Sequence, residues 1–557
     1  MVPWWPVLFV AGWVLQLAVR LPFIANHRVP ILIPDESGYL LAGRLLAGGE
    51  SSDLSGRALY QGGYPLLVSL AYHISENPAT VYQIVLALNA LAGSSVFALA
   101  YVALRRLDVP RVNAYLVAMV TGFLPSVMYY GQFVLTDAIF PVIVLGWLLC
   151  IHAWISRDGQ DWGVAAAAIA AYSASVHSRG MIIVVVHAGL LVAVLVRRWT
   201  TRRDLVISTG VLAGGMGAGW LLNAWVRSEI YPGGAMPLGD WLFERLTTLD
   251  GWGWTLGLVT GKVWYLIVST WGIAGVGLVA AGVVVARGGV PVATRATACV
   301  ALAATTGIAL ATSAAVPDEG TVANFAYGRY LACLAPVFFL AGGAVAMRAS
   351  RPLLLRAVGA AAALAVVSGL IVRVYAGGRL STDFFGVFDF PEMSVMTWSW
   401  NGLKVGWATL AVLPGLAALL FLKYRRVGPV LGAAIIAANL IIVVAVSERI
   451  IRYWGNRLHT ATSLAPARLT ANDVVAIDYR DMPWRIWVSQ AFQAHNHLVP
   501  IDRFNAATLP SRVTLVVVPW RPDQPARKSW PAAPRNFRLT QINWTDTGAW
   551  AAWRRTR

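Results

Sequence analysis

Long apolar stretches and short polar stretches alternate along most of this chain. Runs of about 20 apolar residues, the length that a bilayer span needs, recur from residue 4 to residue 447. The chain is therefore expected to be mostly α, a polytopic membrane bundle of about thirteen helices. We predict these spans at about 4–25, 79–104, 112–133, 138–156, 163–178, 180–196, 205–226, 262–286, 296–315, 330–347, 357–375, 403–422 and 429–447.

The pattern changes near residue 455, where the hydrophobic runs shorten and Pro, Arg and Asn become more frequent. Short apolar runs bounded by turn residues are typical of buried strands. This change of pattern divides the chain into a membrane domain, residues 1–450, and a small soluble α/β domain, residues 451–557. The elements predicted in the second domain are strands at 474–478, 513–519, 537–544 and 550–554 and a helix at 484–495.

Charge is sparse and unevenly placed. The chain is 58% hydrophobic and 13% charged, with a net charge of +18. Most of the positive charge lies in short loops between predicted spans, as the positive-inside rule expects of cytoplasmic loops, so it does not indicate a nucleic-acid partner. The clusters are Arg105, Arg106 and Arg111; Arg157; Arg197, Arg198, Arg202 and Arg203; Arg287 and Arg295; Arg348, Arg351 and Arg356; and Lys423, Arg425 and Arg426.

All these clusters lie on one side of the membrane if the N-terminus is cytoplasmic. We therefore predict a multi-pass protein of the cytoplasmic membrane with an extracytoplasmic C-terminal domain. Four leucines between residues 40 and 46 surround Arg44 at helical spacing, which predicts a short helix lying in the membrane interface. The apolar stretch 64–74 is too short to span and is expected to be interfacial or re-entrant. The longer loops fall on the outer side: 26–78, 227–261, 316–329 and 376–402.

Asp35 and Glu36 place two adjacent carboxylates in the first outer loop. One interpretation is a helix start, because acids favour the first helical turn and Ser37 is a candidate N-cap. The other is catalysis: a carboxylate at the membrane surface suits a general base acting on a hydroxyl acceptor. Either acid is also a candidate ligand for a divalent cation such as Mg²⁺ or Mn²⁺.

Asp137 lies between two apolar runs, at the outer junction of the spans predicted at 112–133 and 138–156. A carboxylate in such surroundings costs free energy, and such residues usually face a polar cavity and function there. An interfacial helix N-cap is the alternative. In the predicted topology Asp137 adds a third acid to the face that carries Asp35 and Glu36.

Candidate cations lie on the same outer face. His177 and Arg179 lie in a short turn between two spans, and Arg329 and Tyr330 lie at the mouth of another. Arginine suits phosphate recognition because its planar fork binds two oxygens; snorkelling towards lipid headgroups is the alternative. Lys262, at the start of a span, is a further candidate.

Acids and arginines on one face suit a substrate that combines an anionic phosphate with a lipid tail. The chain has no G-x-x-x-x-G-K-[ST] motif, which would cradle the phosphates of a nucleotide. Asp318 and Glu319, also in an outer loop, are more typical of solvated loop acids.

Several short motifs, in their order and topology, resemble the GT-C glycosyltransferases that use polyprenyl-phosphate sugars, especially protein O-mannosyltransferases and lipid A aminoarabinose transferases. The resemblance covers roughly residues 1–350. The motifs are Asp35-Glu36-Ser37-Gly38-Tyr39, Ala42-Gly43-Arg44-Leu45-Leu46, Gly63-Tyr64-Pro65-Leu66-Leu67, Thr136-Asp137-Ala138, His177-Ser178-Arg179-Gly180, Trp264-Tyr265 and Gly328-Arg329-Tyr330-Leu331.

The resemblance implies an inverting transfer of a sugar from a polyprenyl-phosphate donor to a hydroxyl acceptor: a glycan, a lipid or a protein. Asp35 would activate the acceptor and Asp137 would assist. Glu36 is a further catalytic candidate, with a structural role or a metal ligand as the alternatives. Arg179 and Arg329 would hold the lipid phosphate. The remaining substrate-binding candidates are Tyr64, His177, Lys262 and Tyr330. Membrane lipids would surround the bundle, and a metal is used by only some family members.

Two other functions fit a multi-span protein. A transporter or flippase of lipid-linked sugars would be expected to have internal repeats and charges near mid-span, whereas the charges here gather at one face. A polysaccharide ligase or polymerase would be expected to carry its key Arg and His residues in a large late loop, whereas the acids here lie in the first loop.

Overall fold

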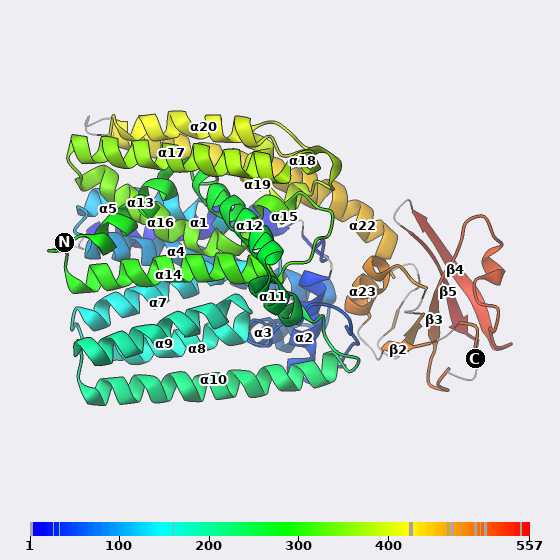
Figure 1. Cartoon of the computed structure of the whole chain (residues 1–557). Coiled ribbons are helices and arrows are strands. Elements are labelled where there is room, and N and C mark those ends of the chain that lie inside the picture. The colour runs from blue at the N-terminus through cyan, green and yellow to red at the C-terminus, as the bar shows by residue number, and fades with distance from the viewer. Residues whose placement is uncertain are drawn as a thin grey trace.

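The computed structural model forms a long helical bundle with a small sheet at one end, and the N-terminus lies at the other end (Figure 1). Within the bundle most helices lie side by side along a common direction. The structure describes residues 4–25, 27–32, 34–159, 161–422, 427–464, 467, 469–470, 473–478, 481–494, 498–501, 503–505, 509–545 and 548–556.

The first part of the bundle begins with α1, and the first outer loop contains two short helices. The elements are α1 (Trp4–Ala25), α2 (Asp35–Leu46), α3 (Pro65–Ile74), α4 (Pro78–Arg106), α5 (Arg111–Gly122), α6 (Pro125–Met128), η1 (Tyr130–Gln132), η2 (Thr136–Ala138), α7 (Phe140–Ile155), α8 (Asp161–Val176), α9 (Arg179–Arg197) and α10 (Arg202–Ile230).

The second part alternates long helices with short helical turns. The elements are α11 (Leu238–Thr247), α12 (Leu249–Val268), α13 (Ile273–Ala286), α14 (Val292–Ala315), α15 (Ala323–Ala326), η3 (Arg329–Leu334), α16 (Ala335–Arg348), α17 (Arg351–Ala376), α18 (Arg379–Thr382), η4 (Val387–Asp389), α19 (Pro391–Met396), α20 (Val405–Leu419), α21 (Val427–Ser447), η5 (Glu448–Trp454) and α22 (Gly455–Thr462).

The long helices confirm a polytopic membrane bundle. Among the described residues, eight helices are long and apolar enough to cross a membrane, or ten if each of two bent pairs counts as one span. The other three predicted runs form shorter helices, α7 and α8 of 16 residues and α20 of 15. All thirteen predicted runs are therefore helical, and two of them are bent pairs of helices.

The bent pairs are α5 with α6, at 56°, and α12 with α13, at 114°. At the second bend Trp271 and Gly272 have positive φ angles of 56° and 81°, and the Gly272 amide donates to the Ile267 carbonyl at 3.0 Å. A left-handed glycine with such a bond ends a helix. Irregular backbone at membrane depth is stable where protein buries it; a Cβ on Gly272 would lie 2.5 Å from Leu416 Cγ.

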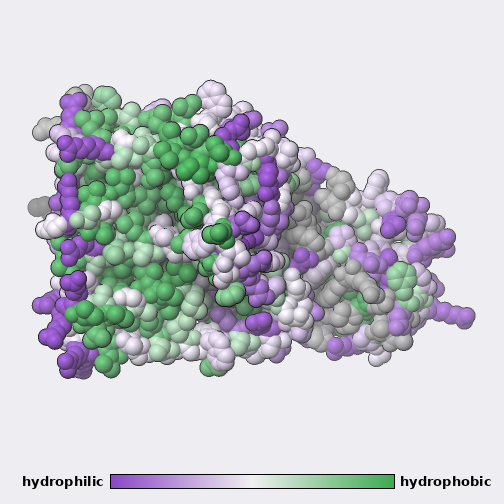
Figure 2. All heavy atoms as spheres, viewed as in Figure 1, coloured by the Kyte–Doolittle hydropathy of each residue, from purple (hydrophilic) through white to green (hydrophobic). Residues whose placement is uncertain are grey.

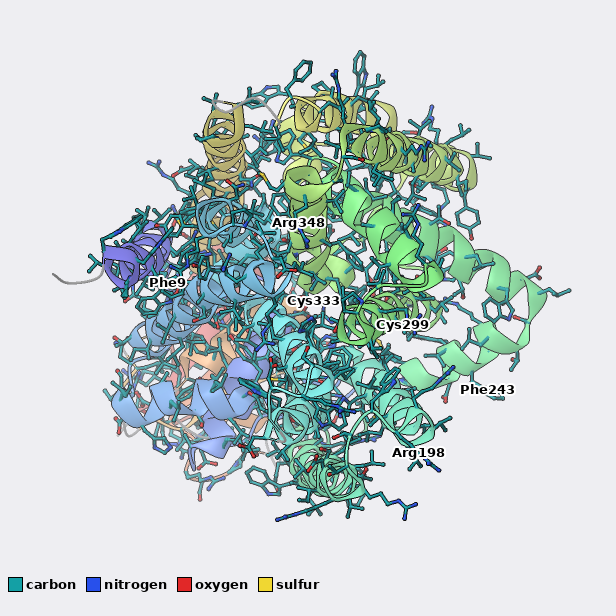
Figure 3. All side chains as sticks on the ribbon, turned by 90° about the vertical axis from the view of Figure 1, so that its left-hand side faces the viewer. Phe9, Arg198, Phe243, Cys299, Cys333 and Arg348 are labelled. Carbon is teal, nitrogen blue, oxygen red and sulfur yellow. The ribbon has the colours of Figure 1, made fainter. Side chains whose placement is uncertain are left out.

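Several basic loops meet at the end of the bundle that carries the N-terminus, where a polar rim borders the apolar belt (Figure 2). Arg106 pairs with Asp158 at 2.6 Å, and Arg348 lies 3.8 Å from Asp108. Figure 3 shows Arg198 and Arg348 in a view from this end. The loops predicted to share one side therefore share one end, although Lys423, Arg425 and Arg426 lie outside the described residues.

The loop 26–78 forms the two expected short helices, but Leu40 and Leu41 of α2 do not face lipid, as an interfacial helix would need. Leu40 and Leu41 are fully buried, because α2 packs against α3 and the C-terminal part of the chain. The N-cap of α2 is Pro34, so the prediction of Ser37 as N-cap is wrong. In contrast, α3 exposes Leu66, Leu70 and Ile74, as expected of an interfacial helix.

The C-terminal part folds into one mixed sheet with strand order β2-β1-β3-β5-β4. Strand β1 pairs in parallel with β2 and β3, while β5 pairs antiparallel with β3 and β4. The four predicted strands and the predicted helix are confirmed, and β2 is an addition. The elements are β1 (Val475–Ile477), α23 (Trp484–Gln493), β2 (Leu498–Pro500), β3 (Leu515–Pro519), β4 (Phe537–Thr545) and β5 (Gly548–Arg555).

Candidate active site

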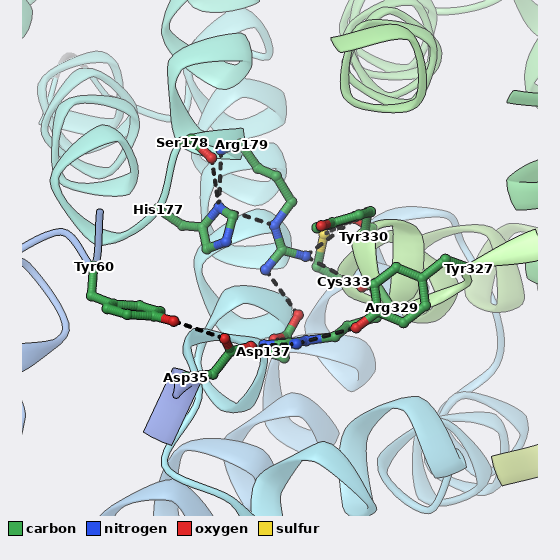
Figure 4. A network of polar contacts seen from close by, with 10 residues as sticks. All are labelled: Asp35, Tyr60, Asp137, His177, Ser178, Arg179, Tyr327, Arg329, Tyr330 and Cys333. Atoms are coloured by element: carbon green, nitrogen blue, oxygen red, sulfur yellow. Dashed lines mark hydrogen bonds and ion pairs between the residues drawn. The ribbon is translucent and has the colours of Figure 1, made fainter. Parts of the chain in front are cut away.

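Asp137 lies in the middle of a buried charge cluster (Figure 4). The short helix η2 holds it between two apolar segments, and its side chain is 2% exposed. Its Oδ1 accepts from Arg179 Nη2 at 2.8 Å, and its Oδ2 accepts from Arg329 Nε at 2.7 Å. Burial alone would raise the pKa of Asp137, but the two arginines outweigh it and hold that pKa well below its ordinary value.

Asp35 is the first residue of α2 and faces the same cluster from the loop 26–78. Its Oδ2 accepts from Arg329 Nη1 at 2.8 Å, and its Oδ1 accepts from the Tyr60 hydroxyl at 3.0 Å. The Asp35 side chain is 34% exposed, far more than that of Asp137. One guanidinium thus bridges both aspartates, and only Asp35 presents a carboxylate towards solvent.

Arg179 and Arg329 occupy different positions in the cluster. Arg179 begins α9, and its side chain is 1% exposed; its Nη1 donates to the carbonyls of Arg329 and Tyr330 at 3.3 and 3.2 Å. Arg329 is 11% exposed, and its Nη1 also donates to the Tyr327 hydroxyl at 3.1 Å. Arg329 is therefore the more exposed of the two cations, while Arg179 holds the backbone that carries it.

His177 acts as a neutral acceptor beside Arg179. Its Nδ1 accepts from the Arg179 amide at 3.1 Å, from Arg179 Nε at 3.4 Å and from the Ser178 hydroxyl at 3.2 Å. Burial, and then the Arg179 charge, hold the pKa of His177 well below its usual range. An uncharged ring that accepts at Nδ1 orients the guanidinium without repelling it.

Lys262 and Tyr330 form a second layer behind the arginines. Lys262 is buried, and its Nζ donates to the hydroxyls of Thr312 and Ser313 at 2.9 and 2.8 Å. The same ammonium lies 5.0 Å from the centre of the Tyr330 ring, and the Arg179 guanidinium lies 5.7 Å from it. Tyr330 is therefore held between two cations by cation–π contacts.

Glu36 points away from this cluster. Its Oε1 accepts from the amides of Ile31 and Leu32, each at 2.8 Å. Its Oε2 accepts from the Val134 amide at 2.8 Å and from the Tyr82 hydroxyl. The carboxylate is fully buried and joins the start of α2 to the segment before Asp137, which fits the structural role that the sequence left open for Glu36.

Tyr64 also lies apart from the cluster. Its hydroxyl donates to Asn89 Oδ1 at 2.9 Å, and its ring packs edge-on against Tyr39. Among the described residues, no group of three or more His, Cys, Asp and Glu side chains is placed to hold a metal ion. Asp35 and Glu36 turn to different partners and do not form a common ligand pair.

Tyr60 and Tyr327 belong to the cluster but carry no clear signal in the sequence. Tyr60 lies in an irregular loop, and its hydroxyl meets Asp35 only because the loop folds back onto α2. Gly38 permits this approach, since a Cβ there would lie 2.1 Å from Tyr60 Cδ2. The sequence signal for this contact was the position of Gly38, three residues after Asp35, because a glycine lets another segment approach the backbone closely.

No family model matches the chain, and no curated protein matches it in sequence. Its structure is similar to that of ArnT from Cupriavidus metallidurans bound to undecaprenyl phosphate, with a TM-score of 0.58 and 17% identity over 99% of this chain and 98% of that one. ArnT from the same organism in the apo state gives a TM-score of 0.56 and 17% identity over 98% and 97%. The chain therefore has the GT-C fold of ArnT, as the resemblance of its motifs predicted.

Proposed function

We propose that this protein is an inverting glycosyltransferase that moves a sugar from a polyprenyl-phosphate donor to a hydroxyl acceptor on the outer face of the membrane. The observation that carries the proposal is the half-open cluster around Arg329, in which a partly exposed carboxylate and a guanidinium share a hydrogen bond. The fold it shares with ArnT, whose structure contains undecaprenyl phosphate, supports a lipid-phosphate donor.

In the proposed reaction Asp35 is the general base. The acceptor oxygen forms a bond to the anomeric carbon of the sugar, and its proton passes to an Asp35 oxygen. The bond between that carbon and the phosphate oxygen breaks on the opposite side, so the configuration inverts. The electron pair leaves with the polyprenyl phosphate.

Arg329 is the proposed partner of the departing phosphate. Its side chain is 11% exposed and already lies 2.8 Å from Asp35, so it lies beside the position where a phosphate and an activated hydroxyl would meet. Asp137 and Arg179 hold Arg329 from the buried side. We assign them to positioning, because both side chains are almost fully enclosed. Glycans, lipids and proteins all carry hydroxyl groups, so all three remain candidate acceptors.

The test compares purified full-length wild type with Asp35→Asn in nanodiscs, using undecaprenyl-phosphate monosaccharides as donors and mass spectrometry of the products. Loss of the base is expected to lower kcat about 10³-fold, within the range of general-base contributions. Glu76→Gln is the matched control, because Glu76 is an exposed carboxylate of the same outer loop.

Transfer by Asp35→Asn at the wild-type rate would disprove the assignment of the base. Movement of a labelled lipid-linked sugar across protein-containing liposomes, with no transfer product, would instead indicate a flippase. Use of diphosphate-linked oligosaccharides only would indicate a ligase.

A further inference from the structure

The catalytic helix of the proposed function, α2, is attached at its far end to the C-terminal domain. Arg44 lies in the last turn of α2 and is 7% exposed. Its Nη1 donates to the Ala494 and Ala491 carbonyls at 2.7 and 3.2 Å, although these residues lie 450 and 447 positions away in the chain. Both carbonyls belong to the C-terminal end of α23, where a positive charge is favourable.

Arg44 also fixes the loop that follows α2. Its Nη2 donates to the Ser52 hydroxyl at 3.0 Å and its Nε to the Glu50 carbonyl at 3.2 Å. The planar guanidinium therefore joins three segments at once: α2, the first outer loop and α23. A lysine offers one ammonium group and no such fork.

The start of α2 has a second contact with the C-terminal part. Gly455, the first residue of α22, packs against Ile31, and a Cβ there would lie 2.8 Å from Ile31 Cδ1. The Ile31 amide is one of the donors that hold Glu36, next to Asp35. The C-terminal part thus contacts the last turn of α2 and the segment that leads into its start.

Hydrogen bonds within the C-terminal part hold α22 and α23 in place. The Ser489 hydroxyl of α23 donates to Thr462 at the end of α22 at 3.1 Å. The Trp550 indole of β5 donates to the Ala461 carbonyl at 2.8 Å. Displacement of the sheet would therefore move α22 and α23, and through them Arg44.

We propose that Arg44 is a positioning residue through which the C-terminal domain holds α2 and sets the place of Asp35. The kinetic consequence of this proposal rests on the proposed transferase function. Its structural part, the attachment of α2 through Arg44, does not. A shift of about 1 Å at a reacting group can lower a rate about 100-fold. The C-terminal domain then contributes to catalysis without contacting the substrate.

The structural part is tested by hydrogen exchange on full-length protein in nanodiscs. Arg44→Ala is expected to speed exchange in peptides covering α2 and α23, because local opening there becomes easier, and to leave α9 and α16 unchanged. Arg28→Ala is the control, since Arg28 is an exposed arginine of the same loop. Unchanged exchange in α2 would overturn the proposal whether or not the protein transfers sugar.

The kinetic part uses the same variants with undecaprenyl-phosphate monosaccharide donors. Arg44→Ala is expected to lower kcat about 10- to 100-fold with an unchanged KM for the donor, and Arg44→Lys to restore part of the rate. In the Asp35→Asn background, Arg44→Ala is expected to lower the residual rate no further, because both act through one group.

Additive losses in the double variant, or a normal kcat for Arg44→Ala despite a loosened α2, would overturn the proposal. If Arg44→Ala does not fold, Arg44→Lys carries both tests. Absence of transfer by the wild type would disprove the proposed function alone, since the exchange experiment decides the attachment of α2 independently.

Discussion

The turn that carries Asp137 and the helix that begins with Asp35 hold the same guanidinium from opposite sides. At the turn, the carboxylate is 2% exposed and pairs with two arginines. At the helix, the carboxylate is 34% exposed and pairs with one arginine and one tyrosine. Two aspartates that are alike in chemistry therefore differ in their access to a substrate.

The difference shows that burial can give two carboxylates of one charge cluster different roles. The enclosed carboxylate of Asp137 stabilises the cations around it, but its burial leaves it out of reach of a reactant. A partly exposed carboxylate can exchange a partner for a substrate at small cost. On this comparison, we propose that Asp137 positions the cluster and that Asp35 is the general base.

Replacing Asp137 gives the largest expected effect on stability. Asp137→Asn leaves the Arg179 guanidinium buried without its countercharge, which is expected to destabilise the fold by about 3–5 kcal/mol. Thermal unfolding in detergent measures this, with the exposed Asp240→Asn as control. If Asp137→Asn were as stable as Asp35→Asn, the proposed difference in role between the two aspartates would be wrong.

Replacing the shared guanidinium tests the link between the two sides. Arg329→Lys keeps the charge but loses the planar fork that reaches both aspartates, so kcat/KM is expected to fall about 100-fold. Steady-state kinetics with undecaprenyl-phosphate sugars measure it, and the exposed Arg227→Lys is the matched control. A fall of less than threefold in kcat/KM would show that activity does not require one guanidinium to bridge both aspartates.

Removing the tyrosine contact tests the exposed side alone. Burial, and then the nearby Asp35 charge, raise the pKa of Tyr60 well above its ordinary value, so the hydroxyl stays protonated and donates. Tyr60→Phe loses a hydrogen bond to a charged group, worth about 1.5–3 kcal/mol, and is expected to lower kcat at least tenfold. The control is Tyr115→Phe, whose hydroxyl bonds the Leu8 carbonyl; equal rates for both variants would contradict the assignment.

Asp389, in the loop beside the cluster, gives an expected effect on stability that depends on pH. Burial raises the pKa of Asp389 from 3.8 to about 7. The unfolded chain therefore releases this proton at lower pH than the folded chain, so the stability of the wild type falls between about pH 4 and 7. Asp389→Asn is expected to melt above the wild type at pH 8 and close to it at pH 4. A constant difference in melting temperature across this range would contradict the prediction.

The hydrophobic pattern predicted helices better than it predicted their continuity. All thirteen apolar runs are helical, and the apolar runs after residue 470 became β1 and β3. The bend at Gly272 was not predicted, because an apolar run with a glycine reads the same whether the helix passes through or ends there. Nor was β2 predicted, since a three-residue strand takes its stability from pairing with β1.

The position of the candidate site followed partly from sequence order. Asp35, Asp137, Arg179 and Arg329 were singled out as chemistry-bearing residues at span ends, and the structure brings all four together. Glu36 was grouped with them because it adjoins Asp35, but successive side chains on a helix point in different directions. Only the fold shows that its partners are three backbone amides and the Tyr82 hydroxyl.

The sequence by itself determined which segments enter the bilayer, which end of the bundle collects arginines and which polar residues lie at the opposite end, because those features depend on local transfer free energy. The tertiary structure decided which carboxylate is enclosed and which faces solvent, and it joined Arg44 to a helix some 450 residues later. Burial and long-range pairing depend on how all the helices pack, which no local pattern encodes.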